Sequence, residues 1–158
     1  IVLPIEAQFS QTNGIIVEDF DKDGFSDILI SGNNYGTEIS TGRYDASNGV
    51  FLKGNGDCTF KTVKNSGFYV PFDAKAMVSA FNSKGQIEIL VAQNRGSLKI
   101  FKTNLFMEKQ KVAPNAQSYS YQYNNKTFKK ELYYGSSYLG QSSRYIVIPA
   151  GAKSLKIQ

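Results

Sequence analysis

The chain contains an internal repeat, and this repeat limits the folds that are open to it. A shift of 61 residues aligns residues 16–30 with residues 77–91, and the apolar positions, one Phe and one Gly coincide in the two copies. In each copy, short apolar segments rich in β-branched residues flank a glycine-containing turn, a pattern that indicates strands. Repeats of this size built from short strands predict propeller blades or a similar β-array.

The turn of the first copy is rich in carboxylates. Asp19, Asp21, Asp23 and Asp27 occupy positions 1, 3, 5 and 9 of a nine-residue segment that also contains a glycine. Without a counter-ion these side chains would repel one another, whereas Ca²⁺ accepts about six to eight oxygen ligands. We therefore predict a calcium site in which the four aspartates give side-chain oxygens and Phe25 gives its backbone carbonyl.

Two other interpretations of this turn deserve comparison. An EF-hand also opens with D-x-D-x-D-G, but it needs a glutamate at position 12 and a helix on each side. Position 12 is Ile30, and the flanking residues 14–18 and 28–31 have the composition of buried strands. A hairpin turn with solvated carboxylates is the second alternative, and it accounts for one aspartate where four are present.

The second copy keeps the fold pattern and loses the ligands. Ala80, Asn82, Lys84 and Glu88 stand where the first copy has its four aspartates. Since Lys84 brings a cation to the place of the metal, we expect one ion site and one turn without an ion, in which Lys84 pairs with Glu88.

The two copies differ most in the connection that follows their second strand. The first copy has the insertion 32–48, rich in Tyr, Arg, Asp and Asn, where the second has only residues 93–96. Loops on a rigid scaffold often carry binding groups, so we predict ligand contacts there. The candidate residues are Tyr35, Arg43, Tyr44 and Asp45. A surface loop that packs on itself is the alternative.

Composition argues against several function classes. The chain has no histidine and a single cysteine, so a thiolate or hydroxyl nucleophile would lack its usual base, and we expect no enzymatic activity. No apolar run is long enough for a membrane span. The net charge is +5, but the lysines are scattered and no recognition motif accompanies them, so we expect no nucleic-acid partner.

The acidic turn and the later segment 54–60, Gly-Asn-Gly-Asp-Cys-Thr-Phe, resemble the FG-GAP or VCBS repeats of β-propellers. Those blades carry a D-x-D-x-D-G-x-x-D calcium loop and often a G-x-G-D-G-T-F-type turn, from which this chain departs at Cys58. The resemblance covers about residues 8–102. It implies placement outside the cell or in the cell envelope, structural Ca²⁺, and binding or adhesion in place of chemistry.

The composition changes near residue 113, and residues 128–143 are similar to the ASPIC/UnbV module. That module commonly follows VCBS repeats in large bacterial surface or secreted proteins. We therefore expect an all-β chain with two repeats of a partial propeller in residues 1–110 and a small β module in residues 111–158. Because two blades cannot close a propeller, the open strand edges would be covered by this module or would pair with a second copy.

These observations predict a calcium-stabilised, non-catalytic binding or adhesion segment of a larger bacterial envelope or secreted protein. Its expected partner is a glycan or a protein. Two alternatives stay open: an accessory portion of a polysaccharide-degrading enzyme, and a purely structural spacer.

Overall fold

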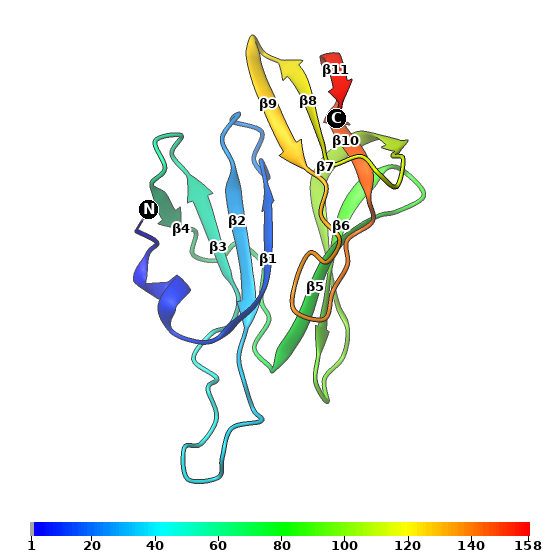
Figure 1. The fold of residues 1–158 in the computed structure, drawn as a ribbon. Coiled ribbons are helices and arrows are strands. Elements are labelled where there is room, and N and C mark those ends of the chain that lie inside the picture. Colours follow the sequence, from blue (N-terminus) through cyan, green and yellow to red (C-terminus); the bar gives the residue numbers. More distant parts are fainter. Residues whose placement is uncertain (1) are drawn as a thin grey trace.

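The computed structural model describes residues 2–158 and consists of β-strands. Eleven strands form three antiparallel sheets, and the only helical element of this range is the 3-10 turn η1 (Ile5–Gln8) (Figure 1). The predicted all-β class is confirmed, while the described residues form no closed propeller. Among residues 2–158 no helix has both the length and the apolarity that a membrane crossing requires.

The first sheet is a four-stranded meander in which each strand pairs with the next along the chain. Its strands, in spatial order, are β1 (Thr12–Glu18), β2 (Asp27–Gly32), β3 (Val50–Gly54) and β4 (Phe60–Thr62). In the first pair, Val17 lies opposite Ile28. Leu52 in β3 is fully buried, whereas the alternate residues Phe51 and Lys53 are only partly buried, as the two-residue period of a strand requires.

The second sheet repeats this order for three strands and then departs from it. Its order is β10 (Tyr145–Pro149), β7 (Lys99–Lys111), β6 (Gln86–Gln93) and β5 (Ala74–Phe81). The pair β5–β6 stands 60 or so residues after β1–β2, in agreement with the sequence repeat. Its fourth strand is β10, which comes from much later in the chain, whereas the fourth strand of the first sheet is the next strand in sequence, β4.

The third sheet is small and packs around β10. It has the order β11 (Lys153–Ile157), β8 (Ser118–Tyr123) and β9 (Lys126–Glu131). Tyr119 and Tyr121 lie on one face of β8 with their rings 6.2 Å apart, and they share a buried cluster with Ile146 of β10. The C-terminal region thus contributes both to a sheet of its own and to the second sheet, and its boundary near residue 110 stays a prediction.

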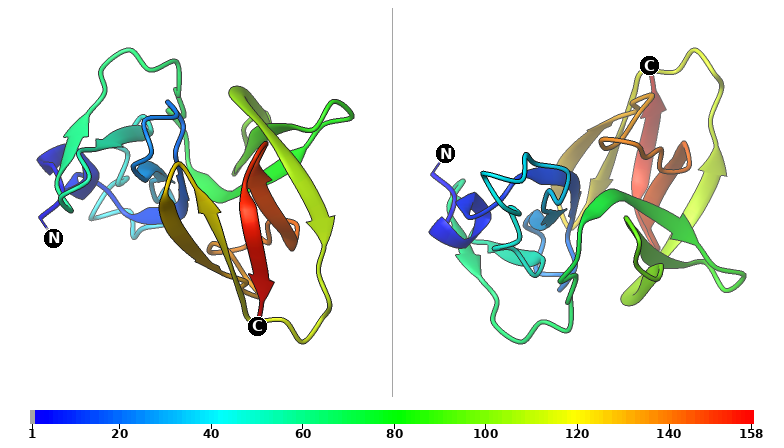
Figure 2. Two further views of the ribbon diagram at one scale, coloured as in Figure 1. Left: turned by 90° about the horizontal axis from the view of Figure 1, so that it is seen from above. Right: turned by 90° about the horizontal axis from the view of Figure 1, so that it is seen from below.

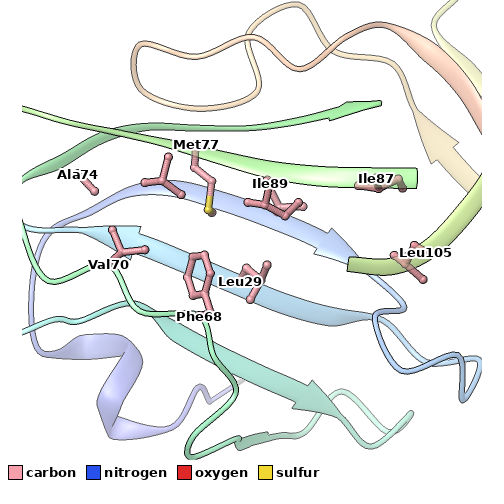
Figure 3. Close-up of a cluster of buried hydrophobic side chains, with 10 residues drawn as sticks. Leu29, Phe68, Val70, Ala74, Met77, Ile87, Ile89 and Leu105 are labelled. Atoms are coloured by element: carbon pink, nitrogen blue, oxygen red, sulfur yellow. The ribbon is translucent and has the colours of Figure 1, made fainter. Parts of the chain in front are cut away.

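The main core lies between the first two sheets. Ile16 and Leu29 of the first sheet share one buried cluster with Met77, Ile89 and other apolar side chains of the second sheet, several of which are fully buried. Figure 3 shows Leu29, Met77 and Ile89 in this core. The buried amide of Asn13 adds a polar tie, because its nitrogen donates to the carbonyls of Asn33, at 3.0 Å, and Ala74, at 2.8 Å. The repeats are therefore joined face to face by apolar packing and by the hydrogen bonds of the Asn13 side chain.

A loop from the C-terminal region lies along the first strands of both repeats. We call residues 136–142 the sealing loop. The amide of Tyr138 donates to the carbonyl of Asn13 in β1, the hydroxyl of Ser137 donates to the carbonyl of Met77 in β5, and the hydroxyl of Ser142 accepts from the amide of Ser79, each at 3.1 Å. In Figure 1 this orange loop lies beside β5. It supplies hydrogen-bond partners to strand edges that the sheets leave open.

Candidate metal centre and ligand pocket

The acidic turn connects β1 to β2 and gathers three carboxylates. Oxygens of Asp19, Asp21 and Asp27 all lie within 4.8 Å of one another. Because Ca²⁺–oxygen distances are about 2.3–2.6 Å, two ligands on opposite sides of one ion are separated by up to about 5 Å. The spacing of the three side chains therefore suits a single divalent cation.

Asp27 is the anchor of this group. It is the first residue of β2 and is fully buried, and its carboxylate accepts hydrogen bonds from the amide of Phe20, at 3.0 Å, and from the amide of Gly54, at 2.9 Å. Burial raises the pKa of Asp27, the two amides oppose this effect, and the charges of Asp21 and Asp23 add to it. Asp27 thus links the turn to the end of β3 while carrying a charge that a cation would stabilise.

The backbone of the turn is folded around the other carboxylates. Asp19 accepts hydrogen bonds from the amides of Asp23, at 3.1 Å, and Gly24, at 2.8 Å, and Asp23 accepts one from the amide of Phe25, at 2.9 Å. Lys22 and Gly24 adopt left-handed φ values of 65° and 86°, which a glycine accepts without strain. The sharp bend expected of this segment is therefore present.

Lys53 is a part of this centre that the sequence analysis did not identify. Its ammonium forms an ion pair with Asp21 and lies 2.7 Å from an oxygen of Asp23. The hydrogen bond from Lys53 is the main cause that lowers the pKa of Asp23, and the two carboxylates raise the pKa of Lys53. The antiparallel pairing of β2 with β3 brings Lys53 to the turn, so its role became visible only once that register was known.

Lys53 divides the four predicted aspartate ligands into two groups. Asp19, Asp21 and Asp27 form the compact set, whereas Asp23 lies beside the lysine and outside that set. Asp21 belongs to both groups, so a cation bound by the compact set would compete with Lys53 for Asp21. The assignment of Asp23 and of the Phe25 carbonyl as ligands stays a prediction.

The corresponding turn of the second repeat is organised by an amide. The side-chain oxygen of Asn82 accepts from the amides of Lys84, at 2.9 Å, and Gln86, at 3.1 Å, and its nitrogen donates to Glu88 at 3.1 Å. The predicted ion pair between Lys84 and Glu88 is wrong, since no such pair forms within residues 2–158. A neutral side chain that both donates and accepts can hold this turn together without a cation.

A cavity lies next to the acidic turn. It has a volume of about 550 Å³ and is lined by the turn, by β7 and by the β8–β9 hairpin, with Phe25, Phe106 and Tyr121 among its aromatic side chains. Lys130 and Glu18 form an ion pair of 2.5 Å at its wall. The ammonium of Lys126 lies 4.5 Å from the centre of the Phe25 ring. We call this cavity the turn cleft.

A second pocket contains two of the four predicted ligand residues. Tyr35 and Arg43 line a space of about 390 Å³, with the Arg43 guanidinium 4.8 Å from the centre of the Tyr35 ring. Phe72, Asn94 and Arg95 complete its wall together with Gly36. We call it the arginine pocket. The long cyan loop that carries Tyr35 and Arg43 extends from the end of the first sheet in Figure 1.

The other two predicted ligand residues do not line the arginine pocket. The backbone of Tyr44 pairs with that of Asn34, and both Tyr44 and Asp45 are exposed. Asn94 and Arg95 were missed by sequence reasoning, although the repeat carried a signal for them. They stand in the second repeat at the connection that corresponds to the insertion of the first.

Comparison with known proteins adds no assignment. No family model, no curated protein and no solved structure matches this chain.

Proposed function

We propose that the chain is a calcium-stabilised, non-catalytic binding segment of a larger bacterial envelope or secreted protein. The observation that carries the proposal is the convergence of Asp19, Asp21 and Asp27 within 4.8 Å. One of these three carboxylates is buried and accepts a backbone hydrogen bond from the adjacent strand β3. The resemblance of this turn to FG-GAP or VCBS repeats supports the placement outside the cytoplasm.

The cation has a structural role in this proposal. It neutralises the compact carboxylate set and holds the β1–β2 turn against the end of β3, so it stabilises the first sheet. Without calcium, Lys53 neutralises part of the same charge through Asp21 and Asp23. Calcium would bind the folded chain and not the unfolded one, because the three carboxylates meet only in the fold.

The ligand in this proposal is a glycan, held at the arginine pocket. The pocket combines exposed aromatic surface with charged and amide groups, which is the mixture that fixes a polar ligand with apolar faces. A glycan array probed with the purified chain tests this part. Binding to proteins only, or to no glycan at all, would contradict it.

Thermal unfolding with calcium and with a chelator tests the metal part. At a calcium concentration of about 100 times the dissociation constant, the ion adds about 2.7 kcal/mol, which raises the melting temperature of a chain of this size by roughly 5–11 °C. The variant Asp21→Ala should lose this response. The matched control Asp57→Ala removes an exposed aspartate from another turn and should keep it. Identical melting curves with calcium and with chelator for the unaltered chain would refute the proposal.

A further inference from the structure

The arginine pocket is built from equivalent positions of the two repeats. Arg43 belongs to the connection between β2 and β3, and Arg95 to the connection between β6 and β7. In each repeat this is the segment after the second strand. The two side chains line one pocket because the first and second sheets pack against each other (Figure 2). A ligand that contacts both arginines therefore contacts both repeats.

Arginine is used sparingly in this chain, and its placement is informative. The sequence has three arginines and fifteen lysines. Arg144 has a structural role, since its guanidinium donates to the carbonyls of Pro114, at 3.1 Å, and Ala116, at 2.7 Å. The two remaining arginines both line the arginine pocket. In the described part of the chain, neither of them forms an ion pair.

No carboxylate lines this pocket to neutralise the two guanidinium groups. Asp73 is fully buried, is paired with Lys75 at 2.6 Å, and accepts a hydrogen bond from the side-chain nitrogen of Asn94 at 3.1 Å. The pocket wall therefore carries two positive charges and no negative one. The planar fork of a guanidinium matches the two oxygens of a carboxylate better than an ammonium does.

The other groups of the pocket point to a sugar as the carrier of the anion. The nitrogen of the Asn94 side chain is used by Asp73, which leaves the Asn94 oxygen to accept a hydroxyl hydrogen. The ring of Phe72 is about half exposed, at 48%, and offers an apolar face of the kind on which ring C–H groups pack. A hydroxyl acceptor, aromatic faces and two anion donors together suit an acidic saccharide.

Arg95 lies in the tight turn that connects β6 to β7. This residue has a φ of +56°, in the left-handed region that glycine and asparagine accept more readily. This conformation belongs to the turn between β6 and β7, which brings Arg95 to the arginine pocket.

We propose that the arginine pocket binds a negatively charged sugar, with a uronate carboxylate held between Arg43 and Arg95. This inference deepens the proposed function and rests on it, since it names the glycan class for the same pocket. The glycan spans the two repeats, with Asn94 accepting from a hydroxyl and Phe72 packing on the ring.

Titration calorimetry with oligogalacturonate, its methyl-esterified form and a sulfated oligosaccharide tests this assignment. The acid form should bind at least about tenfold more tightly than the ester, because esterification removes the charge-assisted hydrogen bonds. The double variant Arg43→Gln, Arg95→Gln should lose this preference. The double variant Arg43→Lys, Arg95→Lys keeps the charge, loses the planar fork, and should bind with intermediate affinity.

The control is Lys153→Gln, Lys156→Gln, which removes two exposed positive charges in β11 and should bind as the unaltered chain does. If the sulfated oligosaccharide binds more tightly than oligogalacturonate and this binding also depends on the two arginines, the anion site is supported and the bound anion is a sulfate group. Equal binding of acid and ester, or equal binding of a polyglutamate peptide, overturns the inference while calcium stabilisation stands. The proposed function itself fails if calcium leaves the melting temperature of the unaltered chain unchanged, and its glycan part fails if no glycan binds.

Discussion

Asp27→Ala separates the structural role of the acidic turn from its role in holding a cation. The carboxylate of Asp27 is fully buried and is the acceptor for the amides of Phe20 and Gly54. A buried donor left without a partner costs about 1–3 kcal/mol, so losing both acceptors should lower the free energy of unfolding by roughly 2–6 kcal/mol. This loss should be present in chelator, where no calcium contributes.

Asp21→Ala is the matched variant for this experiment. Asp21 is partly exposed and makes its contacts with Lys53 and with the turn itself, so in chelator its removal should change stability much less. In calcium, both variants should lack the stabilisation that the unaltered chain gains. Asp27→Asn should not restore stability, since an amide nitrogen would face one of the two amide donors.

Urea unfolding at neutral pH, in chelator and in calcium, is the assay. The expected order of stability in chelator is the unaltered chain, then Asp21→Ala slightly below it, then Asp27→Ala well below both. If Asp27→Ala in chelator lay within about 0.5 kcal/mol of the unaltered chain, which is the range of a neutral surface substitution, the argument from buried acceptors would be refuted.

Three further predictions concern the same fold. Lys53→Met removes the cation that competes for the turn carboxylates, so calorimetry should show tighter calcium binding, and unchanged or weaker binding would contradict the competition. Gly67 has a left-handed φ, so Gly67→Ala should lower the free energy of unfolding by about 1–2 kcal/mol. Gly56→Ala should lower it by more, because the φ of Gly56 is similar and the added Cβ would also overlap the Phe25 ring. Equal losses for the two variants in urea unfolding would contradict this. Burial raises the pKa of Tyr119 to about 12 from 10.0. The unfolded chain therefore loses the Tyr119 proton first, and the free energy of unfolding should fall by about 3 kcal/mol as the pH rises from 10 through 12. Tyr119→Phe should remove that part of the pH dependence, and unfolding curves of equal slope with pH for both chains would refute it.

The strands that the repeat contains could be predicted, because their signal is local. The apolar segments around the two turns became β1, β2, β5 and β6, with the turns where the glycines stand. The position of β10 in the second sheet could not be predicted in this way. Its partner β7 is distant in sequence, and no turn or repeat fixes their register.

The residues of the candidate sites also fall into those with a local sequence signal and those without one. The compact carboxylate set was visible in the spacing of Asp19, Asp21 and Asp27, since a short turn must bring such neighbours together. Lys53 and Arg95 were not visible, because each reaches its site only through the pairing of strands or the packing of sheets. Sequence reasoning therefore found residues that share a loop and missed those that the tertiary fold adds.

The sealing loop has a consequence for how the chain must assemble during synthesis. Its contacts with Asn13 and Met77 join segments that leave the ribosome long before the loop itself does. Until Ser137 and Tyr138 leave the ribosome, the carbonyls of Met77 and Asn13 lack these hydrogen-bond donors. A chain that ends before residue 136 would therefore expose unpaired edges of β1 and β5. We expect such shortened chains to accumulate in inclusion bodies.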